Sequence, residues 1–266
     1  MSIKKIFKKK ALNVFFRCID QEHLLSILLK INYGAGADIT VGGEGRNIRK
    51  ILKKLEEKYP NDQYVLFDVG ANIGNYSKEL RCVFSGKADI HAFEPLPSTY
   101  NMLKKEVESY HINCYNVGLS DKEGVLPFYI DKQGSRIASV YHRRLDHFNV
   151  KMDITEDCNF TTVDEFCANN NLERIHFLKI DVEGHELAVL GGANKMIEDG
   201  RIDFIQFEFG GCNIDSRTFF QDFWYFLHDK YDIYRIIPTG LYPIKEYTEM
   251  REIFMCSNYL AELKTR

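Results

Sequence analysis

The sequence lacks several patterns that mark common protein classes. Its seven cysteines are odd in number, are scattered and include no CxxC pair, so they indicate neither a zinc site nor a disulfide framework. No apolar run approaches the roughly 18 to 20 residues of a membrane-spanning helix, and Arg17 and Asp20 interrupt the apolar pattern near the N-terminus. We therefore expect a cytoplasmic protein with reduced thiols, without a secretory signal or an integral membrane segment.

A large net charge is missing as well, but the total conceals two parts of opposite sign. The formal net charge is −3, yet residues 1–60 contain 13 basic and 6 acidic residues, whereas the remainder contains 22 basic and 32 acidic residues. A protein that grips nucleic acid over a wide surface needs a basic face to neutralise phosphates. The acidic excess after residue 60 therefore argues against a nucleic-acid partner and favours a small-molecule or glycan-like substrate.

We interpret residues 1–60 as a basic helical extension that precedes the main domain. Between residues 3 and 29 apolar side chains recur every three or four positions and lysines occupy the other side, which predicts a basic amphipathic helix. The glycine-rich stretch 34–45 breaks this periodicity, and 46–58 resumes it as a short helix that ends before Pro60. We predict that residues 46–60 cap the domain that follows, and the role of 3–29 stays open.

Residues 61–266 have the pattern of one α/β domain, in which strands alternate with helices as in a mainly parallel sheet covered on both faces. The predicted strands are 64–68, 89–93, 111–119, 175–181, 204–209, 231–236 and 252–259, and the predicted helices are 74–84, 97–109, 162–169, a segment from about 185, and 216–229. Residues 125–130 form a hairpin-like excursion into a polar stretch, 131–160, which we interpret as an inserted loop or lid.

The strongest local signal is the segment 68-DVGANIG-74, which follows the first predicted strand. The strand ends in Asp68, and the chain then runs through Gly70 and Gly74 into a helix. Glycines at such a turn let the backbone bend tightly and let a ligand approach the main chain. The spacing lacks the full G-x-G-x-x-G of dinucleotide-binding folds, so the loop is not built for a pyrophosphate.

Two further acids close later strands of the predicted sheet. Glu94 ends the second strand, where a carboxylate can accept hydrogen bonds from both hydroxyls of a ribose. Asp181 ends a later strand at the same edge of the sheet. Together with the glycine loop, these acids predict a nucleoside-bearing cofactor without phosphates. S-Adenosylmethionine fits this description, because its cationic sulfonium suits a crevice that carboxylates line.

Five segments together resemble the FkbM-type methyltransferase family, namely 68-DVGANIG-74, 93-FEP-95, 117-VGLSD-121, 162-TVDEF-166 and 179-KIDVEGHE-186. The resemblance covers about residues 64–261 and leaves the first 60 unexplained. It implies the class I S-adenosylmethionine-dependent methyltransferase fold, a doubly wound and mainly parallel α/β sheet of seven strands with an antiparallel last strand. By resemblance, the cofactor contacts fall on Asp68, Gly70, Asn72, Gly74, Glu94, Leu119, Ser120, Asp121 and Asp181.

Methyl transfer needs a protein that orients donor and acceptor and that removes a proton from a hydroxyl acceptor. We place Asp181 beside the methionine or methyl end of the donor, and Glu183 and Glu186 near the acceptor. The alternative for Glu186 is that it only caps the helix that begins near residue 185. His185 is a candidate general base because it titrates near neutral pH, and otherwise it lies on a helix face.

Glu208 ends the strand before two glycines, so it either lines the pocket or is held by neighbouring backbone amides. Asp181, Glu208 and Asn213 could form an oxygen-rich site for Mg²⁺. No ligand spacing in the sequence favours a metal, however, and we predict none.

The segment 134–144 carries three arginines that could hold an anionic acceptor. They are Arg136, Arg143 and Arg144. A solvated loop with its charges in water is the preferred interpretation. The aromatic residues of 219–231 recur at helical spacing, which predicts core packing rather than a platform for sugar stacking.

These observations predict an S-adenosylmethionine-dependent O-methyltransferase that acts on a sugar hydroxyl in the biosynthesis of glycans, polysaccharides or related metabolites. The methyl transfer follows from the residues and the sugar from the resemblance. Two alternatives stay open, a donor-binding module of the same fold without turnover and a metal-assisted small-molecule O-methyltransferase. The Asn/Asp-Pro-Pro-aromatic tetrapeptide of enzymes that methylate nucleic-acid amino groups is absent, which again disfavours nucleic acid.

The basic segment 3–29 has two interpretations at the level of the cell. It either covers the catalytic domain or rests its lysines on an anionic membrane surface or on a glycan-assembly enzyme. In the second case the protein lies at the inner face of the membrane rather than free in the cytoplasm.

Overall fold

The computed structural model describes residues 23, 42–132, 134–135 and 137–265 of the 266-residue chain. The amphipathic helix predicted for 3–29 lies outside the described residues except for His23, so its role stays a prediction. Within the part of the chain that the structure describes, every helix is too short or too polar to cross a membrane.

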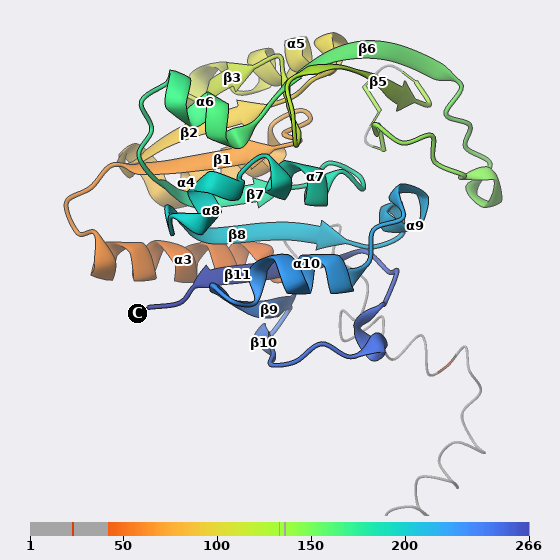
Figure 1. Ribbon diagram of the computed structural model, residues 1–266. Helices are drawn as coiled ribbons and strands as arrows, with labels where there is room; N and C mark the ends of the chain where they lie inside the picture. Colours follow the sequence, from red (N-terminus) through yellow and green to blue (C-terminus); the bar gives the residue numbers. More distant parts are fainter. Residues whose placement is uncertain (1–22, 24–41, 133, 136, 266) are drawn as a thin grey trace, which may run out of the picture.

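A twisted central sheet organises the molecule (Figure 1). Its eight strands follow the order β10-β9-β11-β8-β7-β1-β2-β3. The strands are β1 (Tyr64–Val69), β2 (Ala88–Phe93), β3 (Asn113–Tyr115), β7 (Ile175–Ile180), β8 (Ile202–Phe209), β9 (Tyr231–Ile237), β10 (Gly240–Ile244) and β11 (Ser257–Leu263). Strands β3, β2, β1, β7 and β8 run parallel to one another, and β11 is antiparallel to both β8 and β9. The predicted doubly wound α/β fold with an antiparallel last strand is therefore confirmed.

Two details of the strand prediction are wrong. The sheet has eight strands rather than seven, because residues 240–244 turn back after β9 and pair with it antiparallel as β10. The last strand begins at Ser257 rather than at residue 252, because a 3₁₀ turn at Glu249–Arg251 and an irregular stretch precede it. Its apolar residues also extend farther than predicted, to Leu263.

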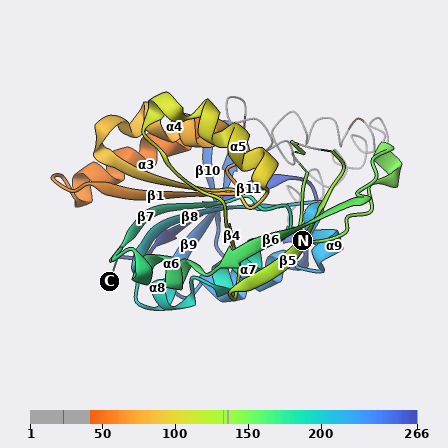
Figure 2. The ribbon, with the colours of Figure 1, turned by 90° about the horizontal axis from the view of Figure 1, so that it is seen from above.

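Helices cover both faces of the sheet, and each face has its own core (Figure 2). One face carries α3 (Glu44–Lys58), α4 (Asn75–Phe84) and α5 (Pro97–Glu106), and the other carries α6 (Val163–Asn169), α7 (Glu186–Gly191), α8 (Asn194–Glu198) and α10 (Phe220–Leu227), with α9 (Cys212–Ser216) beyond the end of β8. On the second face, Phe223 stacks on Phe207 at 4.8 Å between ring centroids. The predicted core role of the aromatic residues in α10 is confirmed for Phe220, Phe223 and Trp224, which are buried.

Helix α3 packs directly onto the sheet. Its Ile48, Ile51 and Leu55 are buried in one cluster with Leu66 of β1 and Leu260 of β11. The predicted helix at 46–58 is thus present, two residues longer at its start, and its apolar stripe faces the sheet as an amphipathic helix requires.

The segment 118–161 departs from the prediction, because it builds a second, smaller sheet beside the first. This sheet has the order β4-β6-β5, from strands β4 (Gly118–Leu119), β5 (Gly124–Ile130) and β6 (Ile154–Thr161). The single strand predicted for 111–119 is divided because Asn116 donates from Nδ2 to the carbonyl oxygens of Glu94 (3.0 Å) and Pro95 (2.8 Å), where the chain leaves the main sheet.

Strand β6 lies in a stretch that the sequence predicted as a loop. Its sequence, ITEDCNFT, buries only Cys158 and Phe160 and leaves most of the other side chains exposed. Such a strand packs against the protein with one face and exposes the other to solvent. Its sequence is therefore too polar to be recognised as a strand. The predicted helix at 216–229 also begins later, at Phe220, because the left-handed residue Arg217 ends α9 before it.

Candidate active site

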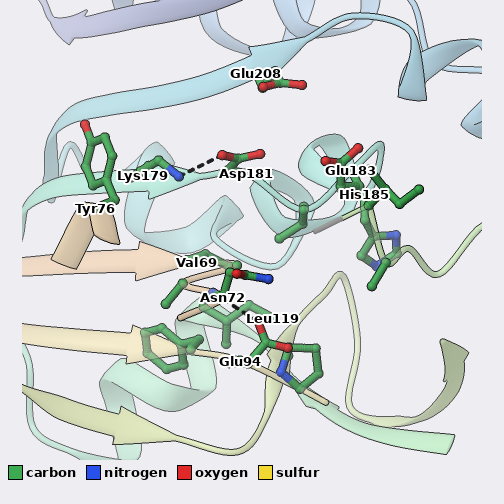
Figure 3. A pocket seen from close by; sticks show the side chains of 18 of the residues that line it. Val69, Asn72, Tyr76, Glu94, Leu119, Lys179, Asp181, Glu183, His185 and Glu208 are labelled. Atoms are coloured by element: carbon green, nitrogen blue, oxygen red, sulfur yellow. Dashed lines mark hydrogen bonds and ion pairs between the residues drawn. The ribbon is translucent and has the colours of Figure 1, made fainter. Parts of the chain in front are cut away.

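A cavity of about 560 Å³ opens at the carboxyl ends of the parallel strands (Figure 3). Ligands of open α/β sheets bind at this edge, next to the strand from which the chain order runs outward in both directions. Here that strand is β1, with β2 on one side and β7 on the other. The volume lies within the range of small-molecule sites, roughly 300–1,000 Å³. The cavity is therefore the candidate active site.

The glycine loop between β1 and α4 forms one wall of this cavity. Gly70 has φ 77°, and a Cβ atom on it would lie 1.9 Å from the carbonyl oxygen of Asp181. Asn72 takes the left-handed conformation at φ 48°, which asparagine tolerates better than most residues. Gly74 has φ 82° and starts α4. The predicted loop residues Gly70 and Asn72 line the cavity, whereas Gly74 lies behind it.

Glu94 lies at the end of β2 and lines the cavity, as the sequence predicts for a ribose acid. Its carboxylate accepts hydrogen bonds from the backbone N–H groups of Asn72 (3.1 Å) and Leu96 (3.0 Å). Burial raises the pKa of Glu94 to about 7, although these two backbone hydrogen bonds oppose the rise. The two N–H donors fix the carboxylate while leaving it acceptor capacity toward a ligand.

Asp68 lies beneath the cavity rather than in its wall. Its side chain is fully buried, accepts a hydrogen bond from Ser77 Oγ at 2.5 Å and lies 3.8 Å from Lys179 Nζ. Burial raises its pKa, and the charge of Lys179 opposes that rise. Asp68 therefore supports the site through other side chains, which differs from the direct cofactor contact that the resemblance implied.

Lys179 is a site residue that the sequence reasoning missed. Its ammonium donates to Asp181 Oδ2 at 3.0 Å and lies 4.6 Å from the centre of the Tyr76 ring. Burial alone would lower the pKa of Lys179, but the charges of Asp181, Asp68 and Glu44 outweigh it and raise the pKa. The signal was present, because Lys179 and Asp181 stand two apart on one strand and so share a face.

Asp181, Glu183 and Glu208 all line the cavity, as expected for the predicted catalytic acids (Figure 3). The Asp181 side chain is 36% exposed, so it is open to the cavity. Burial and the neighbouring Asp181 charge raise the pKa of Glu183 to about 8, although Arg143 opposes the rise. Burial and the charges of Asp181 and Glu183 raise the pKa of Glu208 well above its ordinary value.

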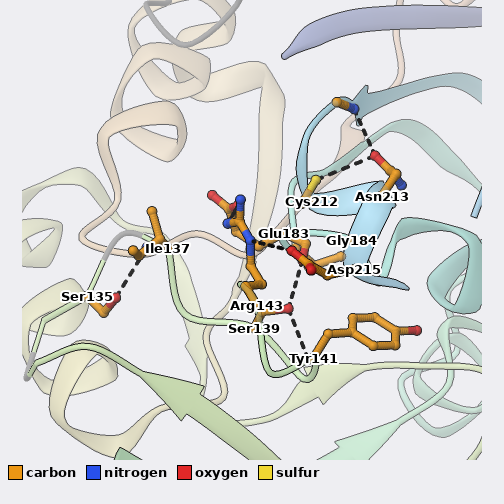
Figure 4. Close-up of polar contacts among 12 residues, drawn as sticks. Ser135, Ile137, Ser139, Tyr141, Arg143, Glu183, Gly184, Cys212, Asn213 and Asp215 are labelled. Atoms are coloured by element: carbon orange, nitrogen blue, oxygen red, sulfur yellow. Dashed lines mark hydrogen bonds and ion pairs between the residues drawn. The ribbon is translucent and has the colours of Figure 1, made fainter. Parts of the chain in front are cut away.

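Arg143 is buried against the acids instead of facing solvent, so the solvated-loop prediction is wrong for this residue (Figure 4). Its guanidinium donates to the Glu183 carboxylate and lies 3.9 Å from Asp215, and only 10% of the side chain is exposed. Ser139 Oγ donates to the Glu183 carbonyl oxygen at 2.7 Å. The segment that contains Ser139 and Arg143 is thereby tied to the turn after β7. Arg136 lies outside the described residues.

His185 lines the cavity, but both of its ring nitrogens have partners. Nε2 lies 2.9 Å from Ser120 Oγ, and Nδ1 lies 3.3 Å from the Tyr141 hydroxyl. Burial lowers the pKa of His185 to about 4, so the ring is neutral at physiological pH. Ser120 is fully buried behind this ring, and Asp121 lies on the exposed side, where it accepts from Ser120 Oγ at 3.0 Å. Of the predicted residues 119–121, Leu119 alone lines the cavity.

Glu186 and Asn213 have structural partners outside the cavity. Glu186 is fully buried and accepts from the backbone N–H groups of Val182 and Gly184, both at 3.1 Å. Glu186 therefore fixes the turn before α7 and does not line the cavity. Asn213 accepts from the Gly210 N–H at 2.8 Å. Among the described residues, no group of three histidine, cysteine, aspartate or glutamate side chains is arranged to hold a metal ion.

The lining of the cavity includes two chemically different sets of residues, which we call the apolar wall and the charged wall. The apolar wall consists of Leu119, Phe128, Ile137, Ala138, Val140 and Phe160. The charged wall consists of Glu44, Tyr76, Lys179, Asp181, Glu208 and Asn258. Asn72 lies between Asp181 on one side and Glu94 on the other (Figure 3). A ligand with an apolar end, hydroxyl groups in the middle and a charged end would match this arrangement.

The sequence model of the Methyltransferase FkbM domain matches residues 68–234. The chain belongs to the FkbM methyltransferase family. Within this family context, the chain is 29% identical over 172 residues to the hexuronic acid methyltransferase AglP of Haloferax volcanii, with 63% of this chain and 64% of AglP covered. It is 22% identical over 169 residues to the 2-O-methyltransferase NoeI of Sinorhizobium fredii, with 60% of this chain and 68% of NoeI covered.

The similarity to AglP thus spans slightly less than two thirds of that protein's length. Among solved structures, a SAM-dependent O-methyltransferase from Thermotoga maritima superposes with a TM-score of 0.40 at 10% identity, covering 83% of this chain and 67% of that one. This likeness is too distant to bear on substrate or mechanism.

Some residues that line the cavity lie outside the part of the chain that matches the FkbM domain. The match ends before Asn258 of β11 and begins after Glu44 of α3, yet both residues line the charged wall. Part of the candidate site of this FkbM family member therefore comes from segments that the family match does not include.

Proposed function

We propose that this protein transfers a methyl group from S-adenosylmethionine to a hydroxyl group of a sugar. The observation that carries the donor assignment is one cavity whose lining combines apolar residues, the Glu94 carboxylate and further charged residues. The apolar wall suits adenine, the Glu94 carboxylate suits the ribose hydroxyls, and the acidic side suits a cation. When bound, the donor supplies a methyl group already activated by its positively charged sulfur.

Asp181 is the residue that we assign as proton acceptor for the sugar hydroxyl. It is open to the cavity, and the Lys179 ammonium holds its carboxylate at 3.0 Å. Glu183 is engaged by Arg143, and His185 has partners on both ring nitrogens. The hydroxyl proton would pass to Asp181 as the oxygen bonds to the methyl carbon and the carbon–sulfur bond breaks, so that the sulfur regains its electron pair.

The acceptor class is supported by the names of two relatives. AglP is a hexuronic acid methyltransferase and NoeI is a 2-O-methyltransferase. The acidic lining of the cavity also argues against a phosphate-rich polymer as acceptor. These points support a sugar hydroxyl, in a glycan or a related metabolite, as the group that is methylated.

Calorimetric titration of the full chain with S-adenosylmethionine and, separately, with NAD tests the donor assignment. We expect binding of the methyl donor and none of NAD. Binding of NAD without binding of the donor would overturn the proposal. Radiolabelled methyl transfer to glycan fractions, with and without EDTA, then tests turnover and metal dependence. Donor binding without transfer to any fraction would instead favour a binding module.

A further inference from the structure

The charged wall of the cavity contains groups of both signs. Glu44, the first residue of α3, is buried with 6% exposed and lines the cavity. Lys179 lines it as well, with 5% of its side chain exposed, and its ammonium stands over the Tyr76 ring. The cavity therefore has a carboxylate and an ammonium in its lining, so a bound ligand would meet charges of both signs.

The ammonium of Lys179 has capacity for a further acceptor. Asp181 accepts one of the three N–H bonds that a lysine ammonium offers, at 3.0 Å. Asp68 lies farther away, at 3.8 Å, and is directed toward Ser77. A ligand carboxylate that reached the cavity side of Lys179 would find a cation that the surrounding acids already hold in place.

The apolar wall and Glu94 determine in which direction a bound donor molecule extends through the cavity. The ribose lies between adenine and the amino-acid end in the donor molecule. If Glu94 holds the ribose and the apolar wall receives adenine, the amino-acid end extends past Asn72 toward Asp181 and Lys179 (Figure 3). That end carries one ammonium and one carboxylate, and the charged wall presents carboxylates, Glu44 among them, together with the Lys179 ammonium.

We propose that Glu44 and Lys179 form the subsite for the amino-acid end of the methyl donor, an inference that rests on the proposed function. Glu44 receives the α-ammonium group, and Lys179 receives the α-carboxylate. Helix α3, which lies outside the family match, then belongs to the donor-binding unit rather than to a separate extension. The charge of Glu44 also acts on Lys179, where it raises the lysine pKa together with Asp181 and Asp68.

Two adenosine compounds separate this subsite from the rest of the donor site. S-Adenosylhomocysteine and 5′-methylthioadenosine share the adenosine and an uncharged sulfur, but only the first has the amino-acid end. Titration of the full chain with each gives an affinity ratio that reports the amino-acid subsite. We expect S-adenosylhomocysteine to bind at least about tenfold more tightly, as hydrogen bonds to charged groups allow.

The test compares this ratio in three isosteric glutamate variants and in Lys179→Met. Glu44→Gln should weaken S-adenosylhomocysteine about tenfold and leave 5′-methylthioadenosine unchanged. Glu57→Gln, at an exposed position of the same helix, should change neither affinity. Glu94→Gln should weaken both compounds by the same factor, because the ribose is common to them. Lys179→Met should lower the affinity ratio in the same way as Glu44→Gln. If Lys179→Met fails to fold, the ratio in Glu44→Gln still tests the inference.

Several outcomes would overturn the inference while the proposed function stands. One is an unchanged ratio in Glu44→Gln, and another is equal weakening of both compounds by that variant. A third is an unchanged S-adenosylhomocysteine affinity together with a raised KM for the acceptor, which would place Glu44 at the acceptor. If the unmodified protein bound neither compound, the proposed function itself would be contradicted.

Discussion

The protonation state of Glu94 should control how tightly the donor binds. In the proposed function Glu94 accepts hydrogen bonds from two ribose hydroxyls, for which it needs its negative charge, but burial raises its pKa to about 7. Below that pH the carboxyl is protonated and offers fewer acceptor sites. Its side chain is 5% exposed, so solvent does not substitute for the missing interaction.

We therefore predict that donor affinity rises with pH and levels off above the pKa of Glu94. Between about pH 6 and about pH 8 the dissociation constant should fall, since the folded, free protein releases the Glu94 proton over that range. Calorimetry at several pH values measures this directly. In Glu94→Gln the affinity should be lower by about tenfold or more at pH 8, and this part of the pH dependence should be lost. A variant with the unchanged pH profile would show that another group titrates.

Asp181 makes a different prediction, because it is assigned to the proton rather than to the ribose. Asp181→Asn keeps the size of the side chain but cannot take up the hydroxyl proton, so we expect kcat to fall by about 10²–10⁴. Donor affinity should change far less than kcat. Steady-state kinetics with the identified acceptor, together with calorimetry, separates the two effects. Asp157→Asn, at an exposed position of β6, is the matched control. A kcat within about threefold of the unmodified protein would contradict the assignment.

At the scale of elements, α3 is an integral part of the sheet's covering layer. Its Ile48 is fully buried with Leu66 and Leu260, which come from β1 and β11. Tyr59, just after the helix, donates from its hydroxyl to Asp203 at 3.0 Å, and Lys58 donates to the same carboxylate at 2.8 Å. The helix is therefore fixed by apolar packing along its length and by polar contacts at its end.

Removal of one buried side chain from α3 should destabilise the whole domain. We predict that Ile48→Ala lowers the free energy of unfolding by about 2–4 kcal/mol, because it removes apolar contacts and leaves a cavity. Urea denaturation followed by circular dichroism measures this change. Lys53→Ala on the exposed face of the same helix should change it by less than about 0.5 kcal/mol. Equal stability of the two variants would mean that α3 does not share the core.

The small sheet shows which elements the sequence could predict and which it could not. Strand β7 is buried at every position from Ile175 to Ile180, so its apolar run was clear and its prediction was confirmed. Strand β6 pairs with β5 from Ile154 to Phe160 but buries few side chains, and its acidic residues suggested a loop. Such a strand is stabilised by backbone hydrogen bonds to its neighbour, and these do not depend on hydrophobic side chains.

At the scale of the whole molecule, the cavity joins segments from the start of α3 to β11. A ligand that touches such distant parts of the chain stabilises the folded state as one unit. Saturation with the donor at about 100 times its dissociation constant should add about 2.7 kcal/mol to the free energy of unfolding. For a domain of this size that corresponds to a rise in Tm of about 5–10 °C.

Differential scanning calorimetry with and without the donor tests this prediction. We expect a single transition that moves as a whole to higher temperature, and a smaller rise for Glu94→Gln at the same donor concentration. A second transition whose temperature does not change with the donor would indicate that residues 44–58 unfold separately from the rest of the domain. That result would favour the boundary near residue 60 that the charge distribution suggested.

The sequence by itself determined most strands and helices of the main sheet, the glycine loop and the acids at the strand ends. These features depend on residues close together in the chain, such as Asp68 to Gly74 or Glu94 after β2, so local patterns carry them. It also indicated the family, because short motifs such as 179-KIDVEGHE-186 hold most of the resemblance.

Only the tertiary structure decided which of those residues face the cavity. Asp68 and Ser120 are buried beside it, whereas Lys179, which was not among the predicted site residues, lies in its wall. Packing also brought Glu44 and Asn258 to the same wall from nearly opposite ends of the described chain. Their position depends on how α3 and β11 pack against the sheet, and contacts between residues so distant in sequence leave no local pattern to read.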